Sequence, residues 1–305
     1  MTNSVSVEDI SKFQLSVHQT YKEHPSLALL LDKLEHISDF EFWNYKSEFT
    51  DLLSSDFVEM AVNKELSAFL EEQYYQLPLY FNNDRAKGWV VISTPYFKFN
   101  IYFFDSNLIN QHRKNNTETK FSIQTTSQDV IMYFPEAKGA ELDIYEVNEG
   151  ENSVDAGPSM KLSQSVKLQD GQYIHLQAGK NAIHFKDVKE DMSYFEITGV
   201  SSDVRVIGEY DLRTLNLIGV SAANLSSSRA EMFSEMVANL QHKPSVPVLE
   251  KLCSHKDHFV RWAAATSLYS LDEESGKRVI FDLTSDPHPD VRNTASQCIN
   301  IFANQ

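Results

Sequence analysis

Two histidines lie close together in the stretch Gly171 to Phe185, which reads GQYIHLQAGKNAIHF. If the Gly-Lys pair at 179 and 180 forms a two-residue hairpin turn, His175 pairs directly with His184. Directly opposed residues of an antiparallel pair have Cβ atoms ~4.5 to 5.5 Å apart. The pattern therefore predicts two imidazoles close enough to share a metal ion or, when protonated, to bind an anion.

Strand alternation sorts the side chains of this predicted hairpin onto two faces. The apolar face carries Ile174, Leu176, Ile183 and Phe185, and the polar face carries Tyr173, His175, Gln177, Ala182 and His184. The polar face is the best place in the sequence to expect a ligand. Two surface histidines paired by accident of alternation are the alternative that the residues leave open.

Other chemical signatures are absent from the sequence. It contains no Gly-rich phosphate loop, no Gly-x-Ser-x-Gly elbow, no His-Glu-x-x-His and no Cys-x-x-Cys. Cys253 and Cys298 lie in apolar helical patterns, which favours buried reduced thiols over a disulfide or a reactive role. His112, in the polar segment NQHRKNN, is the nearest candidate for a third metal ligand.

The elements that would position these residues fall into three regions. Residues 1–80 have apolar side chains at steps of three and four, which predicts an acidic helical subdomain. Residues 81–222 contain short β-branched and aromatic runs, spaced too closely for crossover helices, which predicts a sandwich or barrel. Residues 223–305 have a helical pattern again. We therefore predict a multidomain α+β chain with an all-β centre.

The chain is strongly acidic. Its 27 Lys and Arg against 43 Asp and Glu give a formal net charge of −16, and residues 1–80 hold 14 acidic against 5 basic side chains. A field of this sign repels a phosphate backbone, so we expect no nucleic-acid partner. Because no long apolar run and no apolar signal segment are found, we expect no membrane association and a cytoplasmic location.

An internal repeat occupies the carboxy-terminal region. Two segments, 252–268 and 283–299, match at a constant offset of 31 residues. The shared pattern is a leucine, a short polar turn, Val-Arg, and then an alanine and an aliphatic residue on one helical face. We predict that Val260 and Val291 are equivalent buried positions, next to alanines that let a neighbouring helix approach closely.

The segments SHKDHFVRWAAATSLYSL and SDPHPDVRNTASQCINIF resemble HEAT repeats, whose helical pairs stack into a solenoid. The Val-Arg step and the Asp-Pro turn are structural in that family. The resemblance therefore implies packing and ladder roles for Arg261, Arg292, Asp286 and Pro287, although the first copy has His-Lys in place of Asp-Pro. The helix that begins near Arg229 is out of register and is interpreted as a capping half-repeat. The resemblance also implies a protein partner.

Residues 88–220 resemble the cupin superfamily, whose small barrel commonly holds iron or another divalent metal. Gly171 and Gly179 match the second cupin motif, but Gln177 and Ala182 stand at its proline and ligand-histidine positions. With Asp129 as the acid of the first motif, its two histidine positions fall on Ser and Gln. The standard metal ligands are thus missing. The resemblance implies a degenerate barrel that binds a small ligand at His175, His184, Gln124, Tyr173 and Gln177.

These observations favour a three-part chain: a helical subdomain (1–80), a cupin-like β-barrel (81–222) and a HEAT-like α-solenoid (223–305). The favoured function is a non-catalytic adaptor or sensor that binds a small ligand in the barrel and a protein partner on the repeats. The alternative is a metal-dependent cupin oxygenase or isomerase in which His175 and His184 hold iron or another divalent metal. A purely structural assembly factor is a third possibility.

Overall fold

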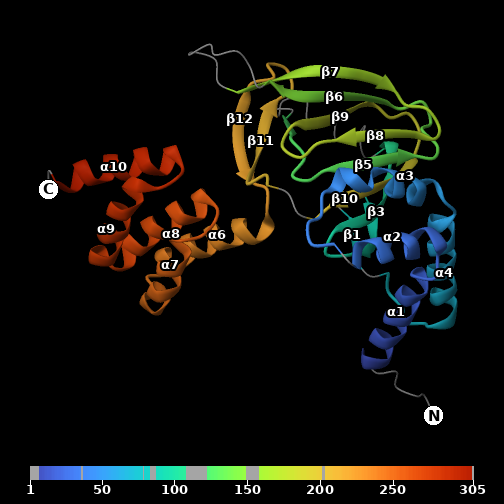
Figure 1. Cartoon of the computed structure of the whole chain (residues 1–305), viewed down its shortest axis with the longest axis horizontal. Helices are drawn as coiled ribbons and strands as arrows, with labels where there is room; N and C mark the ends of the chain where they lie inside the picture. The colour runs from blue at the N-terminus through green and yellow to red at the C-terminus, as the bar shows by residue number, and fades with distance from the viewer. Residues whose placement is uncertain are drawn as a thin grey trace. The chain divides into compact units, whose positions relative to one another are not determined.

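The computed structural model describes residues 7–35, 37–77, 79–82, 87–107, 122–148, 158–200 and 203–303. The chain divides into two units, residues 1–220 and residues 221–305. The first unit contains amino-terminal helices followed by β-sheets, and the second is helical (Figure 1). This order confirms the predicted mixture of helix and sheet in its coarse form. The finer division at residues 80 and 222 stays a prediction.

The amino-terminal helices follow the apolar periodicity of the sequence. Pro25 is the first residue of its helix, where the missing N–H removes no hydrogen bond. The helices are α1 (Val7–Tyr21), α2 (Pro25–Glu35), the short 3-10 helix η1 (Phe42–Tyr45), α3 (Lys46–Ser54) and α4 (Phe57–Glu71).

The described strands form three sheets, and every pairing with a described register is antiparallel. The six-stranded sheet has the order β1 (Tyr80–Asn82), β2 (Lys87–Ser93), β3 (Phe97–Phe104), β10 (Met192–Gly199), β5 (Val130–Phe134), β8 (Gln172–Leu176). A three-stranded sheet has the order β7 (Ser159–Lys167), β6 (Glu141–Asn148), β9 (Asn181–Asp187). The other has the order β12 (Leu217–Ala222), β11 (Val206–Asp211), β4 (Ser122–Gln124). Within the described strands, hydrogen bonding therefore does not close one barrel, which corrects the predicted barrel.

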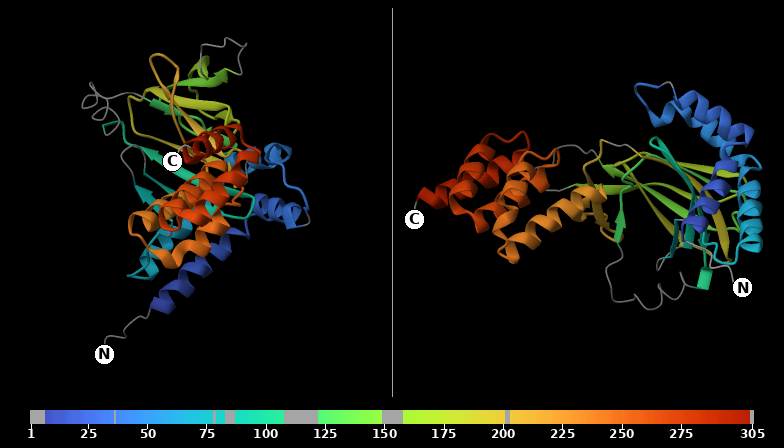
Figure 2. Two further views of the ribbon diagram at one scale, coloured as in Figure 1. Left: turned by 90° about the vertical axis from the view of Figure 1, so that its left-hand side faces the viewer. Right: turned by 90° about the horizontal axis from the view of Figure 1, so that it is seen from below.

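One core joins the helices to the six-stranded sheet. The rings of Phe49 and Phe97 have centroids 5.2 Å apart, and those of Phe57 and Phe99 are 5.4 Å apart. All four side chains are fully buried. The helices of residues 7–71 lie along one side of the strands (Figure 2). They pack on the sheet because alternate residues of β3 present large apolar side chains to them.

A second core fills the space between the six-stranded sheet and the β7-β6-β9 sheet. Its members come from both sheets and include Phe104, Met132, Phe134, Leu142, Ile144, Val166, Ile174, Leu176, Ile183 and Phe185. The four residues predicted to share an apolar face therefore do share a core. A third core, with Tyr145, Ala182 and Tyr210, lies on the opposite face of the β7-β6-β9 sheet.

The second unit consists of helices that pack through small residues. They are α6 (Leu225–Asn239), η2 (Lys243–Ser245), α7 (Val246–Leu252), α8 (His258–Leu271), α9 (Glu273–Asp282), η3 (Leu283–Ser285) and α10 (Pro289–Ala303). Ala264 and Ala295 are fully buried, and Val260 and Val291 are buried in the same core. The predicted burial of the equivalent repeat positions is confirmed.

Truncating either repeat valine is expected to destabilise the second unit. We expect Val260→Ala and Val291→Ala each to lower the free energy of unfolding by ~0.5 to 2.5 kcal/mol, because buried methyl groups are lost. Denaturant unfolding measures the change. Val248→Ala is the control, since its side chain is exposed in α7, and it is expected to change stability by less than about 0.5 kcal/mol. Equal effects at all three positions would contradict the repeat assignment.

Candidate ligand-binding site

The stretch Gly171 to Phe185 does not form the predicted hairpin. β8 pairs with β5, which places His175 opposite Ile131. β9 pairs with β6, which places His184 opposite Asp143. The two histidines lie in different sheets, so the prediction that they face one another is wrong.

The connection between β8 and β9 passes from one sheet to the other. The N–H groups of Lys180 and Asn181 donate to the carbonyl of Gln177 at 3.1 and 3.2 Å. Thr126 holds this turn from outside, because its carbonyl accepts from Gly179 N–H at 2.8 Å and its own N–H donates to the Asn181 carbonyl at 2.9 Å. Gly179 has φ +71°, a left-handed conformation that favours glycine. The turn glycine was predicted correctly, but its long-range partner was not visible in the local sequence.

The two imidazoles also point to opposite outer faces of the layered sheets. The ring of His175 lies against Trp43 of η1, with centroids 6.2 Å apart. His184 alternates with Ile183 and Phe185, which belong to the core between the sheets, so it lies on the far side of β9. The metal-dependent oxygenase hypothesis thereby loses the pair of ligands on which it was based.

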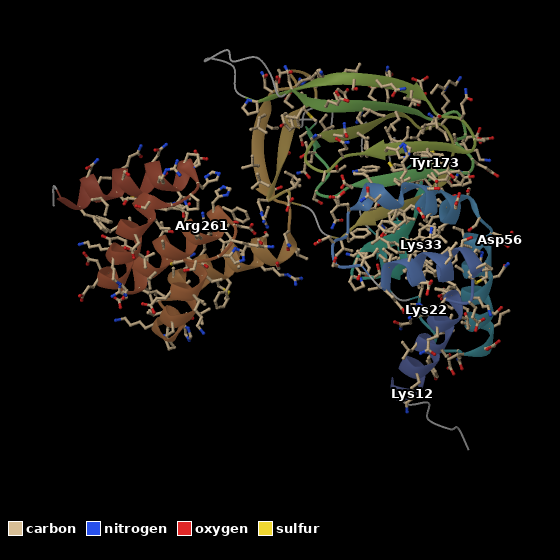
Figure 3. The ribbon with its side chains drawn as sticks, in the orientation of Figure 1. Lys12, Lys22, Lys33, Asp56, Tyr173 and Arg261 are labelled. Carbon is tan, nitrogen blue, oxygen red and sulfur yellow. The ribbon has the colours of Figure 1, made fainter. Side chains whose placement is uncertain are left out.

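The remaining predicted residues are separated as well. Tyr173 packs against α3, where its hydroxyl donates to the Thr50 carbonyl at 3.1 Å (Figure 3). Gln124 lies in β4 opposite Glu209 of β11. Of the five predicted ligand-binding residues, only His175 and Gln177 line the same cleft.

That cleft has a volume of about 760 Å³. Its walls come from η1, the start of α3, strands β6, β7 and β8, and the turn between β8 and β9. β7 and β8 are terminal strands in the described order of their sheets, so the cleft is bordered by an edge strand of each sheet. We name it the lysine cleft, after Lys46, Lys161 and Lys180.

The lining of the lysine cleft is positively charged. Its three lysines face a single carboxylate, Glu146, whose Oε2 lies 3.9 Å from Lys161 Nζ and whose Oε1 accepts from Ser163 Oγ at 2.9 Å. Within the described parts of the chain, neither Lys46 nor Lys180 has a carboxylate at ion-pair distance. The lining therefore has a formal charge of 3 − 1 = +2, in a chain of −16.

His175 adds a neutral imidazole to this cleft. Partial burial against Trp43, and then the positive charge of Lys46, lower the pKa of His175 below its ordinary value. The imidazole is therefore neutral at pH 7 and can either donate or accept a hydrogen bond. Sequence reasoning found His175 and Gln177, but it missed the lysines because they come from three segments far apart in the chain.

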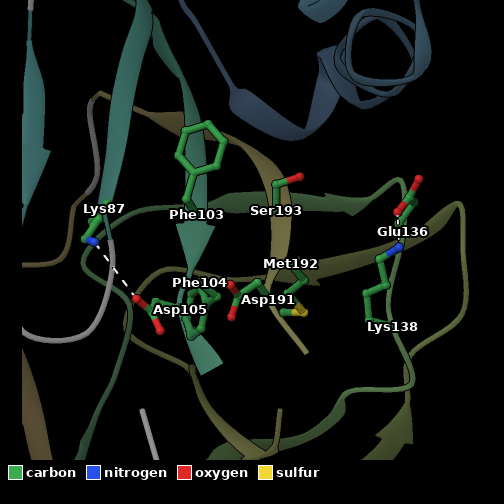
Figure 4. A pocket seen from close by; sticks show the side chains of 9 residues that line it. All are labelled: Lys87, Phe103, Phe104, Asp105, Glu136, Lys138, Asp191, Met192 and Ser193. Atoms are coloured by element: carbon green, nitrogen blue, oxygen red, sulfur yellow. Dashed lines mark ion pairs between the residues drawn. The ribbon is translucent and has the colours of Figure 1, made fainter. Parts of the chain in front are cut away.

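A second cleft, of about 420 Å³, lies beside the ends of β3 and β10 (Figure 4). Its charges are largely paired. Lys87 lies 4.0 Å from Asp105, and Lys138 pairs with Glu136. Asp191 accepts from both the N–H and the hydroxyl of Ser106, which lowers the pKa of this carboxyl. This cleft is the weaker candidate, because its charged groups already satisfy one another.

Glu196 is a partly buried titratable group that the sequence did not reveal. It lies on the same face of β10 as Met192 and Tyr194, which belong to the core between the sheets, and its Oε1 accepts from Asn100 Nδ2 at 3.3 Å. Burial raises the pKa of Glu196 to about 7, although hydrogen bonds from Tyr102 and Asn100 act in the opposite direction. The alternation of β10 places Glu196 on the face of Met192 and Tyr194, but it does not show that a second sheet covers this face.

The residues of the first unit do not fit a metal ion of the kind that cupins commonly hold. Among the described residues, no group of three or more His, Cys, Asp or Glu side chains could hold one. His112, the candidate third ligand, lies outside the described residues. The lysine cleft is lined by cationic and amide groups, which are poor ligands for a cation.

The second unit contains a buried ion-pair ladder at the residues that the HEAT resemblance indicated. Arg261 donates to both carboxylate oxygens of Asp286, at 2.7 and 2.6 Å, and both side chains are buried. Nη1 of Arg261 also donates to the carbonyls of His255 and Lys256. At the equivalent position 31 residues on, Nη1 of Arg292 donates to the carbonyls of residues 286 and 287. The implied structural roles of the two arginines are confirmed.

Comparison with known proteins supports the assignment of the second unit. Residues 228–300 match the family described as HEAT repeats, which confirms the HEAT-like region predicted from the sequence. No curated protein matches the chain. Among the described residues, no helix has the length and apolar character needed to cross a membrane.

Solved structures similar to this chain include several named as cupins. KdgF from Halomonas sp. is 13% identical, with a TM-score of 0.26, and the match covers 41% of this chain and 87% of that one. An RmlC-like cupin from Shewanella frigidimarina is 8% identical, with a TM-score of 0.25 and coverage of 42% and 87%. A sugar phosphate isomerase of the cupin superfamily from Silicibacter pomeroyi is 10% identical, with a TM-score of 0.24 and coverage of 46% and 77%. At such scores these structures carry no argument about the fold, ligand, metal or reaction of this chain.

Proposed function

We propose that this protein is a non-catalytic adaptor or sensor. In this proposal the first unit binds a small ligand, and the HEAT-like helices of the second unit bind a protein partner. The match of residues 228–300 to HEAT repeats is the observation that carries the proposal, since helical repeats of this kind generally provide interaction surfaces. The lysine cleft supports the ligand-binding half, because its volume lies in the range of small-molecule sites.

An apolar face of α6 supports the protein-binding half. Met232, Met236 and Leu240 follow one another at steps of four residues and are exposed. The opposite face carries the buried side chains of Ser227 and Ser234. Exposed methionines adapt to different apolar surfaces, so this face suits a partner protein that presents an amphipathic helix.

Charged substitutions on this face test the protein-binding half. We expect the full-length Met232→Glu, Met236→Glu double variant to lose at least about 90% of a partner that the unaltered chain captures from extract, because buried charges oppose apolar contact. The captured protein is then purified and titrated against both chains by calorimetry. Asn293→Glu, Gln297→Glu is the matched control, since it places two charges at the same spacing on exposed positions of α10.

The control must bind the purified partner as the unaltered chain does. Thermal unfolding checks that all three proteins are folded. If the α6 variant binds as tightly as the control, the α6 face is not the interface. If light scattering shows instead that the unaltered chain self-associates through this face, the partner is a second copy, and the adaptor proposal fails in this form.

A further inference from the structure

We infer that the lysine cleft binds a small organic anion that carries at least two acidic groups, carboxylate or phosphate, together with hydroxyl groups. The inference rests on the proposed function, because it names the class of ligand for the site in the first unit. It goes beyond the cupin resemblance, since the cleft is bordered by the edge strands β7 and β8 and, apart from Ile144, its lining residues lie outside the apolar core between the sheets.

Charge is the first reason. Lys46 and Lys180 come from different elements of the lining, one from the start of α3 and the other from the turn between β8 and β9. Within the described residues, neither lysine has a carboxylate at ion-pair distance. Lys46 is also the first residue of α3, where the helix dipole adds positive potential. Two cations without a carboxylate partner, contributed by different elements, suit a ligand with two separated negative groups.

Lys161 completes the set of cations. Its Nζ lies 3.9 Å from Glu146, at the long end of the ion-pair range, so the lysine can turn toward an anion without breaking a close contact. Glu146 remains held by Ser163 in that case. The single carboxylate in the lining therefore does not cancel its positive charge.

The uncharged part of the lining is the reason for inferring that the ligand carries hydroxyl groups. Side-chain amides of Asn148, Gln164 and Gln177 line the cleft, and amides both donate to and accept from hydroxyls. The neutral imidazole of His175 and the indole of Trp43 form an adjacent aromatic surface. A volume of about 760 Å³ holds a small metabolite but no stretch of nucleic acid.

Calorimetric titration of the full-length protein tests the inference with three probes. Citrate carries carboxylates and a hydroxyl, fructose 1,6-bisphosphate carries phosphates and hydroxyls, and glucose is neutral. We expect at least one of the two anions to bind, with an affinity that falls as the salt concentration rises, because salt screens exposed charges. We expect no binding of glucose. The stronger of the two anions identifies carboxylate or phosphate as the acidic group.

Charge removal localises the binding. The Lys46→Gln, Lys180→Gln double variant is expected to weaken binding of the preferred anion on the order of tenfold. Lys64→Gln is the control, because Lys64 is exposed on α4 and does not line the lysine cleft. In NMR spectra, the anion is expected to raise the pKa of His175 by neutralising Lys46, and glucose is not.

Three results would overturn the inference: no binding of either anion, equal binding of glucose, or equal loss of affinity in the double variant and the control. The proposed function is tested by a separate measurement, the binding of the protein partner. Capture of the protein partner depends on α6, so the Lys46→Gln, Lys180→Gln variant should still bind that partner. If the unaltered chain binds neither anion but still binds the partner, only the ligand class is contradicted.

Discussion

Replacing Arg261 with alanine is expected to lower the free energy of unfolding of the second unit by about 3 to 5 kcal/mol. The guanidinium makes paired hydrogen bonds to Asp286, and both side chains are buried. Removing the cation leaves a buried carboxylate without its partner, and it also leaves the carbonyls of His255 and Lys256 without a donor. Denaturant unfolding followed by circular dichroism measures the loss.

An exposed ion pair in the same unit provides the control. Arg278 lies 3.3 Å from Glu250, and both side chains are largely exposed. Arg278→Ala is therefore expected to change stability by less than about 1 kcal/mol. If the two alanine variants lose equal stability, the ladder does not hold the repeats together, and the loss reflects only the shortened side chain.

The ladder also predicts sensitivity to acid. Burial tends to raise the pKa of Asp286, but the hydrogen bonds from Arg261 and from the His288 N–H outweigh it, so the pKa lies below its ordinary value of 3.8. A carboxyl whose pKa is lower in the folded state stabilises the fold above the unfolded pKa, and that stabilisation is lost as the pH falls through the folded pKa. The Asp286→Asn variant should lack this acid-dependent loss.

Glu196 is expected to make the first unit less stable as the pH rises from about 4.5 to 7. Its pKa is raised to about 7 in the folded state, from an ordinary value of 4.5. The folded state therefore holds a proton that the unfolded state has lost in this window, so stability is greatest below pH 4.5 and falls as the pH rises through 7. A shift of this size corresponds to a loss of about 3 kcal/mol.

The Glu196→Gln variant isolates this effect, because the amide has a similar shape and does not titrate. We expect the difference in unfolding free energy between the unaltered chain and this variant to change by about 3 kcal/mol across the window, and the variant to gain in relative stability at pH 7 and above. Glu71→Gln, at an exposed position of α4, measures the effect of removing one surface charge. A difference that stays constant with pH would show that Glu196 does not keep its proton in the folded state.

Much of the second unit could be predicted from the sequence because its structure is mostly local. The offset of 31 residues, the Val-Arg step and the small alanines all express one short helical pattern repeated along the chain. Burial of Val260 and Val291 follows from that pattern, because residues three and four apart share one helix face. The HEAT resemblance implied ladder roles for Arg261 and Asp286, but their pairing was not predicted, since it joins side chains of different repeats.

The candidate site could be predicted only in part. Alternation correctly placed Ile174, Leu176, Ile183 and Phe185 in one core. It also separated His175 and His184 from that core, but it could not show that they lie in different sheets. The predicted two-residue hairpin turn was wrong. Thr126, about 50 residues upstream, makes backbone hydrogen bonds to the glycine turn, which connects the two sheets.

The sequence by itself determined the acidity of the chain, the order of helical and β regions and the HEAT-like repeats, because these depend on composition and on short-range periodicity. The tertiary structure alone decided which strands pair and which side chains meet. Alternation of period two assigns a residue to a face, but the neighbouring strand is chosen by contacts distant in sequence. For that reason Lys46, Lys161 and Lys180 form one positively charged cleft only in the folded chain.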